Sequence, residues 1–472
     1  MRDVKRCVLA NPSSVTVLEG AWAGATGYPF VSMLKYGSLF SLLFACAACG
    51  DDATAPPAVT FDAGPRRDAG PRPDGGPDAG PVDGALPDGA LHDGRIPGTD
   101  GGLPSSCVVD PDADRIKLGE DTLATRRLAP ITPSSTGGFA AFWASAPAGA
   151  EDVFGRIVPQ EGVAPTVVNV TNDAFITRGP AVVAVGTGYL LAWFDNSTTG
   201  FEVWARPLDG ALAPTASAQR ITMNTSRDDQ PAVIRFGTGA LVAWVNDDSA
   251  GSRVAHTRIL DGDASPTTAA VAVTSSPALP DSPILSVRSG GAALSWVDSR
   301  AGSAHVMLLP LDATGAAAGA AYQLDTGGDA DGTLDVDLVE SGGAAVFGVS
   351  VSGSRPEVRF RRLMDSGAPA GDEIPVTPAP ERATSASLTR YRGGWAVAYR
   401  ALSDTGLDSP MIRLALLDAG GNFVRRFDLT NAHEIGGRTT VRASADGTTL
   451  LVTWSDIALS TTSINSARVH CE

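Results

Sequence analysis

The chain has 472 residues, of which 53 are glycine and 33 are proline, and this excludes a mostly helical protein. A hydrophobic content of 43% is enough for a large core, while a net charge of −16 excludes a generic nucleic-acid-binding protein, which needs a basic face. Lysine occurs only three times, so arginine carries almost all of the positive charge. No apolar run reaches the roughly 18 residues of a membrane-spanning helix.

Residues 1–32 do not resemble the beginning of a secretory signal, because they mix acidic residues with prolines. We interpret them as an upstream extension from a start codon assigned too early, with translation beginning at Met33. A genuine long leader is the alternative. Residues 33–48 contain one cation followed by an apolar stretch and small residues, which predicts a signal peptide.

Residues 42–52 read LLFACAACGDD and resemble the lipobox of bacterial lipoproteins. In that family the cysteine after the small residues is lipidated and becomes the new N-terminus. The resemblance implies lipidation of Cys49, because a polar segment begins immediately after it, and Cys46 is the alternative frame. A signal without lipid is a third interpretation. The lipobox implies an exported protein of the cell envelope, an outer-membrane lipoprotein that is either periplasmic or surface-exposed, with the lipid membrane as its partner.

Residues 49–106 are predicted to be a disordered tether. Within residues 50–106, 40 of the 57 residues are Gly, Pro, Asp or Ala, and Asp-Ala-Gly-Pro occurs at 62–65, 68–71 and 78–81. Such a segment has too few apolar side chains for burial to offset the entropy of ordering. Drawn out as polyproline II, it would span about 170 Å.

Seven copies of one pattern follow in residues 127–472: an apolar strand, a glycine turn, an apolar strand ending in an aromatic marker, a polar loop, a strand ending in Leu-Asp, and a fourth strand. A constant period of this kind predicts an all-β, seven-bladed β-propeller of four-stranded blades over residues 107–472, with the marker rings packed between blades. Two β-sandwich domains are the alternative. The markers are Trp143, Trp193, Trp244, Trp296, Gly348, Tyr399 and Trp454, at steps of 50 to 55 residues.

The ends of this region predict how the ring closes. The last copy stops inside its third strand, and residues 114–118, before the first copy, resemble a fourth strand. We therefore expect the N-terminal strand to complete the last blade and remove the open edge. After cleavage before Cys49 and its lipidation, only Cys107 and Cys471 remain as unmodified cysteines. An even pair flanking the seam of an exported protein predicts a disulfide, with free thiols as the alternative.

The sequence contains no His-Glu-x-x-His pair, no Gly-x-Ser-x-Gly elbow and no Gly-x4-Gly-Lys phosphate loop. Polar residues recur two positions past the marker and in the loops between blades, which share one face of a propeller. This face is a candidate site for a cation or a basic partner, and turn capping by each Asp is the alternative. The candidates are Asp195, Asn246, Asp298, Asp456, Asp228, Asp229 and Asp281.

Two acidic segments resemble parts of a calcium-binding loop. The first segment has Arg115 at loop position 6, where such a loop needs glycine. The second segment is a shorter fragment at Asp329, Asp331 and Asp335. Solvated acidic loops are the alternative, and we expect no other cofactor. The first segment would supply loop positions 1, 3, 5 and 12 from Asp110, Asp112, Asp114 and Asp121.

The repeat resembles those of tethered bacterial surface lipoproteins, in which Trp-x-Asp is followed by Leu-Asp-x-x-Gly. Residues 296–298 and 311–315 show it best, and the likeness covers about 365 residues. It implies architecture and location but no activity. The sequence thus predicts a membrane-tethered monomer that presents the propeller to an unknown protein or glycan ligand and is not an enzyme. A carbohydrate-active or other propeller enzyme and a purely structural envelope component are the alternatives.

Overall fold

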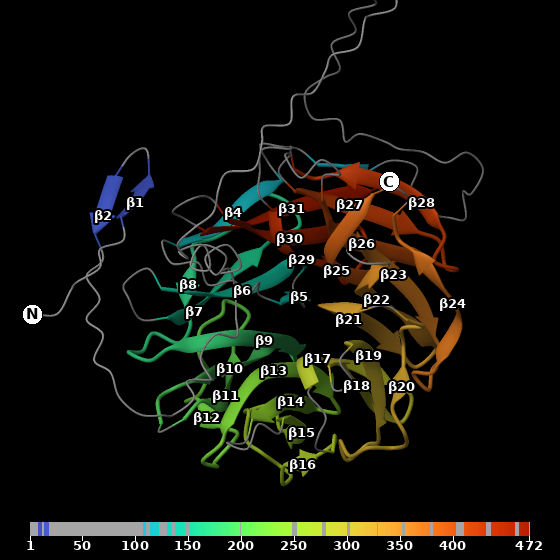
Figure 1. Cartoon of the computed structure of the whole chain (residues 1–472). Helices are drawn as coiled ribbons and strands as arrows, with labels where there is room; N and C mark the ends of the chain where they lie inside the picture. Colours follow the sequence, from blue (N-terminus) through green and yellow to red (C-terminus); the bar gives the residue numbers. More distant parts are fainter. Residues whose placement is uncertain are drawn as a thin grey trace, which may run out of the picture. The chain divides into compact units, whose positions relative to one another are not determined.

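Seven antiparallel sheets follow one another around a ring in the computed structural model, and each sheet is one blade of a β-propeller (Figure 1). The first strands of neighbouring blades contact one another around the whole ring. The predicted all-β, seven-bladed architecture is therefore confirmed. The structure describes residues 8–11, 14–17, 107–109, 114–121, 130–134, 137–146, 151–198, 200–247, 253–275, 280–299, 303–327, 329–351, 355–377, 381–402, 410–430, 436–457 and 462–471.

Six blades consist of four strands that are consecutive in the chain. Blades 1 to 3 are β5 Ile131–Pro133, β6 Phe139–Ser145, β7 Asp152–Val158 and β8 Val168–Asn169; β9 Thr177–Val185, β10 Gly188–Asp195, β11 Glu202–Leu208 and β12 Gln219–Arg220; and β13 Arg227–Phe236, β14 Gly239–Asp247, β15 Arg253–Leu260 and β16 Val271–Ala272. Blades 4 to 6 are β17 Pro280–Arg288, β18 Gly291–Asp298, β19 His305–Leu311 and β20 Tyr322–Gln323; β21 Asp329–Val339, β22 Gly342–Val351, β23 Arg355–Leu363 and β24 Pro369–Pro375; and β25 Arg382–Tyr391, β26 Gly394–Leu402, β27 Met411–Leu417 and β28 Phe423–Asp428.

Blade 7 is assembled from both ends of the domain. Its first three strands are β29 Gly436–Ala443, β30 Thr449–Ile457 and β31 Thr462–Cys471, and the outer side of β31 pairs with β3 Cys107–Val108 and β4 Arg115–Asp121. The closing strand predicted at residues 114–118 is thus confirmed, and it continues to residue 121.

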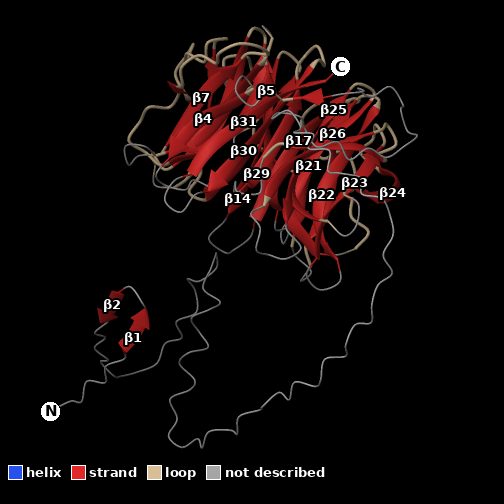
Figure 2. Cartoon of the chain, turned by 90° about the horizontal axis from the view of Figure 1, so that it is seen from above, coloured by secondary structure: helices blue, strands red, loops and turns tan. Residues whose placement is uncertain are grey.

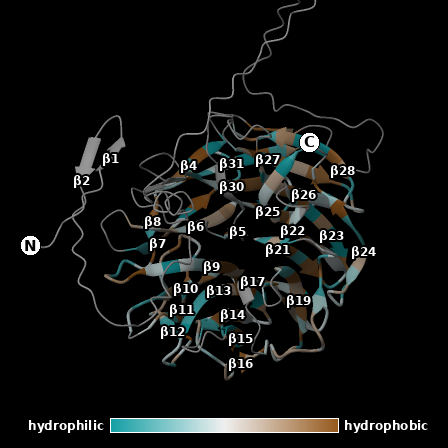
Figure 3. Ribbon diagram, in the orientation of Figure 1, coloured by the Kyte–Doolittle hydropathy of each residue, from teal (hydrophilic) through white to brown (hydrophobic). Residues whose placement is uncertain are grey.

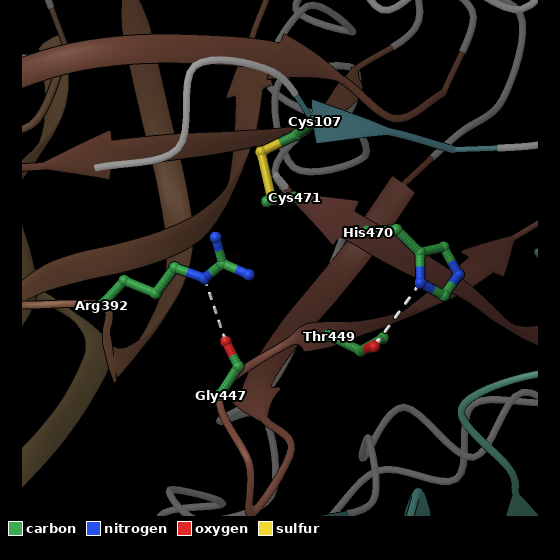
Figure 4. Close-up of a disulfide and its surroundings, with 6 residues drawn as sticks. All are labelled: Cys107, Arg392, Gly447, Thr449, His470 and Cys471. Carbon is green, nitrogen blue, oxygen red and sulfur yellow. Dashed lines mark hydrogen bonds between the residues drawn. A yellow bond between two sulfur atoms is a disulfide. The ribbon is translucent and has the colours of Figure 1, made fainter. Parts of the chain in front are cut away.

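A disulfide joins Cys107 to Cys471 across this seam, 364 residues apart in the chain (Figure 4). The two cysteines are direct partners in the β3–β31 ladder, and their Cα atoms are 4.0 Å apart. This distance is slightly shorter than the roughly 4.4 Å lower limit usual for disulfides, in keeping with residues directly opposite in an antiparallel ladder. The predicted disulfide between Cys107 and Cys471 is therefore present.

Arg468 ties the same seam to blade 1. Its buried guanidinium pairs with Asp114 at 3.1 Å and donates to the carbonyl oxygens of Pro159 and Gly162 at 3.2 and 2.9 Å. His470 also contacts Asp114, at 3.1 Å from Nε2. The closing segment is therefore held by backbone ladders, a disulfide and a buried charged cluster.

The marker aromatics fill the space between blades, as predicted. Trp193 packs in a cluster with blade 1, Trp244 with blade 2 and Tyr399 with blade 5, so each ring faces the preceding blade. The second strands are almost wholly buried. Figure 3 shows hydrophobic residues on strands around the whole ring.

At two positions of the repeat, the structure leaves no room for any residue larger than glycine. A Cβ at Gly291 would lie 2.1 Å from the carbonyl oxygen of Leu311, which begins the Leu-Asp motif of the third strand. Only glycine lets the two strands approach so closely. In blade 5 the marker ring is replaced by Gly348, and a Cβ there would lie 2.1 Å from the carboxylate of Asp331. That carboxylate therefore occupies part of the space that a ring fills elsewhere.

Arginines on the third strands connect neighbouring blades. Arg206 donates to the carbonyl oxygen of Val170 in blade 1 at 2.9 Å, and Arg258 donates to Ile221 in blade 2 at 2.5 Å. Arg361 repeats the contact from blade 5 to blade 4. A planar guanidinium can donate several bonds in fixed directions, which lysine cannot, and this fits the preference for arginine in the chain.

Residues 1–82 form a separate unit, in which the antiparallel hairpin of β1 Val8–Asn11 and β2 Ser14–Val17 is described. The predicted signal peptide (residues 33–48), the lipidation candidates Cys46 and Cys49, and the predicted tether (residues 49–106) lie outside the described residues. No described part of the chain forms a helix long and apolar enough to cross a membrane. The strands run between two faces of the propeller that carry the loops (Figure 2).

The disulfide should stabilise the ring without being essential to it. Cys107→Ser removes the disulfide but leaves the β4–β31 ladder and the contacts of Arg468 with Asp114 and blade 1. We therefore expect the thermal midpoint of unfolding to fall by about 5 °C, with the domain still folded at room temperature. Differential scanning calorimetry measures the shift. Val108→Ser, at an exposed neighbouring site, is the control and should leave the midpoint unchanged. Unfolding of the Cys107→Ser variant at room temperature would contradict this expectation.

Candidate functional site

The loops between second and third strands and the loops between blades lie on one face, which we call the 2–3 face. Ladder registers place the sequence candidates there: Asp228 is opposite Asn246, Asp281 is opposite Val297, and Asp456 is opposite Gly436. The side chain of Asp281 lies outside the described residues, and Asp456 is half-buried. The structure therefore brings the ends of these strands to one face, although most of the carboxylates turn inward.

Two of the candidate carboxylates accept a hydrogen bond from the marker ring of their own blade. The indole Nε1 of Trp193 donates to Asp195 at 3.0 Å, and that of Trp296 donates to Asp298 at 3.4 Å. Both carboxylates are buried, at 3% and 4% exposure. Asp195 also caps the following turn by accepting from the backbone N–H of Ser197 at 2.9 Å. These side chains orient the core rings and the loop ends of the 2–3 face.

In blade 3 the marker indole also donates to a carboxylate, but this carboxylate belongs to the first strand of the blade. Asp228 is fully buried and accepts from the indole of Trp244 at 3.0 Å. It also accepts from Asn246 and Asn224, each at 2.7 Å. The carboxylate of its neighbour Asp229 instead forms ion pairs with Arg227 at 3.0 Å and with Arg253 at 3.5 Å.

A second set of polar residues on this face was not recognised from the sequence. The hydroxyl of Thr222 accepts the backbone N–H of Val203 at 3.0 Å, and a threonine does the same for the third strand of blades 1, 3 and 6. A repeated pair of a hydrophobic residue and Thr is the signal that would have revealed them, at successive steps of 51, 52, 103 and 53 residues. The pairs are 170–171, 221–222, 273–274, 376–377 and 429–430.

In blade 2 a buried glutamate also forms a hydrogen bond with this threonine. Glu202 accepts from Thr222 and from Arg220, the latter at 2.5 Å. Burial raises the pKa of the Glu202 carboxyl, and the hydrogen bonds from Thr222 and Arg220 oppose this rise without cancelling it. The carboxyl group of Glu202 therefore lies in the protein rather than on its surface, as do those of Asp195, Asp228 and Asp298.

The inner strands of blades 5, 6 and 7 share a polar network. The carboxylate of Asp335 accepts from the Ser387 hydroxyl at 2.5 Å and from the Leu388 backbone N–H at 3.1 Å. Arg442 of blade 7 reaches the same carboxylate at 3.0 Å. Burial lowers the pKa of the Arg442 guanidinium, but the charges of Asp335 and Asp337 outweigh burial and the pKa is raised. One carboxylate thus links three blades near the axis of the ring.

The calcium candidates are only partly within the described residues. Asp110 and Asp112 lie outside them, as does the side chain of Asp121, while Asp114 is engaged with Arg468 and His470. Asp329 accepts the backbone N–H of Ala304, and Asp331 accepts that of Thr333. Among the residues that the structure describes, no group of three or more His, Cys, Asp or Glu side chains is placed to hold a metal ion.

Comparison with known proteins does not assign the chain to a family. No family model matches it, and no curated protein matches it. Among solved structures it is similar to TolB from Acinetobacter baumannii (TM-score 0.40, 15% identity, 62% of this chain and 64% of TolB). It is also similar to an N10 neuraminidase-like protein of A/little yellow-shouldered bat/Guatemala/060/2010 (0.41, 8%, 78% and 97%) and to Trypanosoma rangeli sialidase (0.42, 9%, 76% and 60%). The chain thus spans less than two thirds of TolB and of the sialidase, and TM-scores below 0.5 say nothing about ligand or activity.

Removal of the Asp228 carboxylate tests how the 2–3 face is organised. Asp228→Ala leaves Trp244, Asn246 and Asn224 without their common acceptor, so the free energy of unfolding should fall by about 3 kcal/mol. Urea unfolding followed by fluorescence measures the loss. Asp263→Ala, at an exposed turn, is the control and should change stability by less than about 0.5 kcal/mol. Equal effects of the two substitutions would show that the buried carboxylate has no special role.

Proposed function

We propose that the chain is an exported, lipid-anchored lipoprotein that holds its propeller away from a membrane as a binding or scaffolding module. The observation that carries this proposal is the disulfide between Cys107 and Cys471. Disulfides persist in oxidising compartments outside the cytosol and are rare within it. The bond therefore supports export, and it lies at the beginning of the domain that directly follows the tether.

The N-terminal sequence supports the same proposal independently. The lipobox-like residues 42–52 would place an acyl chain on Cys49, or on Cys46 in the alternative frame, and the following segment of Gly, Pro, Asp and Ala would separate the propeller from the lipid. One acyl chain anchors only weakly, so stable attachment requires the several chains that lipoproteins carry or a second contact. A net charge of −16 favours cations or basic partners over nucleic acid.

Fractionation of cells that express cysteine variants tests the anchor. Cys49→Ser should move the protein from the membrane fraction to the soluble fraction, because the acylated residue is lost. Cys46→Ser is the matched control, since it changes the neighbouring cysteine and leaves the preferred frame intact. Immunoblots of the two fractions measure the distribution. Release by Cys46→Ser alone would move the anchor to the other frame, and membrane association of both variants would contradict lipid anchoring.

A further inference from the structure

Blade 6 has an unusual residue directly after its marker ring. In blades 2 to 5 this position holds a buried apolar side chain, namely Phe194, Val245, Val297 and Val349. Blade 6 has Arg400 instead, and the side chain is half-buried. Burial of a cation without a partner is unfavourable, so this exception needs an explanation.

Arg400 faces blade 7. The preceding residue, Tyr399, packs against blade 5, and successive residues of a strand point to opposite sides of the sheet. The ladder partner of Arg400 on β27 is Ile412, which belongs to the buried cluster shared with blade 7. Arg382 lies on the same side of blade 6, since it is two residues from Thr384, the partner of Arg400 on β25.

These two arginines have no acceptor among the described residues. Nε of Arg400 is buried without a hydrogen bond, and its guanidinium forms no ion pair within the described chain. Burial lowers the pKa of Arg400, and no nearby carboxylate counteracts that effect. Arg382 likewise has no hydrogen-bond or ion-pair partner in the described part of the chain. Two other arginines of the blade differ, because Arg413 and Arg426 pair with Glu381 on the side that faces blade 5.

A third donor without a partner in the described part of the chain lies on the side of blade 7 that packs against blade 6. Trp454 occupies the marker position and packs toward blade 6, and its indole Nε1 is buried with no hydrogen-bond partner among the described residues. In blades 2, 3 and 4 the equivalent indole donates to a carboxylate. Asp456, the acidic residue two positions past Trp454, already has an interaction of its own. The interface between blades 6 and 7 therefore presents donors without acceptors at the 2–3 face.

We propose that Arg400, Arg382 and the indole of Trp454 form a binding site for an oxyanion, the carboxylate or phosphate group of a ligand, between blades 6 and 7. A guanidinium donates two parallel bonds to such a group, and the indole supplies one more donor. The partial exposure of Arg400 leaves the site accessible from solvent. This inference adds a ligand class to the binding role proposed above, but it does not depend on the lipid anchor.

The test uses sodium acetate and sodium phosphate as probes, with sodium chloride at equal ionic strength as the reference. Either oxyanion should raise the thermal midpoint of the purified full-length chain above the chloride value, because it binds the folded state alone. Arg400→Val introduces the residue that blades 3, 4 and 5 carry at this position, so the variant should fold at least as stably as the parent in chloride. Its affinity for the oxyanion should be at least about tenfold weaker. Arg235→Met, at an exposed site on β13, is the control and should retain the full response.

A spectroscopic readout locates the site. The chain has eight tryptophans, of which seven follow residue 49, and each one in a ¹⁵N-labelled sample gives one indole N–H signal. One signal should move with the oxyanion, and Trp454→Phe should remove that signal. A response to acetate alone identifies a carboxylate ligand, and a response to phosphate alone identifies a phosphate ligand. Equal midpoint shifts for the parent and Arg400→Val, or no shift beyond chloride, would overturn the proposal while leaving the anchoring proposal unaffected.

Discussion

The structure depends on closure of the ring at blade 7. Without β3 and β4, blade 7 would consist of β29, β30 and β31 alone, and the outer edge of β31 would be unpaired. An unpaired strand edge invites association with other chains. Here β3 and β4 return from the beginning of the domain to cover that edge. Because neighbouring blades bury their second strands against each other, the position of every blade depends on this closure.

A second constraint concerns hydrogen-bond donors at the interfaces between blades. Buried indoles, backbone amides and guanidinium groups lose water when the blades pack, and each lost bond is costly unless an acceptor replaces it. The chain supplies these acceptors in a periodic way. Asp195 and Asp228 accept from marker rings, Thr222 accepts from a third strand, and the carbonyl of Val170 accepts from an arginine of the next blade. At the interface of blades 6 and 7, Nε of Arg400 and the indole Nε1 of Trp454 lack such acceptors among the described residues.

Much of the architecture could be predicted because it rests on periodic, local features. The spacing of the marker aromatics indicated seven blades, and the truncated last copy together with residues 114–118 indicated the seam. Cys107 and Cys471 could be paired because the seam makes their strands neighbours. The site was less predictable. Sequence alone placed Asp195 and Asp298 on the correct face, but it did not show that their carboxylates turn inward to the rings. The contact between Asp335 and Arg442, 107 residues apart, depends on the curvature of the ring and leaves no local signal.

Native-state hydrogen exchange of the full chain tests the role of the seam most directly. If β4 closes the ring as an integral part of blade 7, those of its amides that donate to β31 should exchange as slowly as those of β30, because both are released only when the blade unfolds. Mass spectrometry of peptides that cover residues 115–121 and 449–457 measures the two rates. Exchange of β4 at the rate of exposed loops, with β30 still protected, would contradict the account and show that the ring closes without its N-terminal strand.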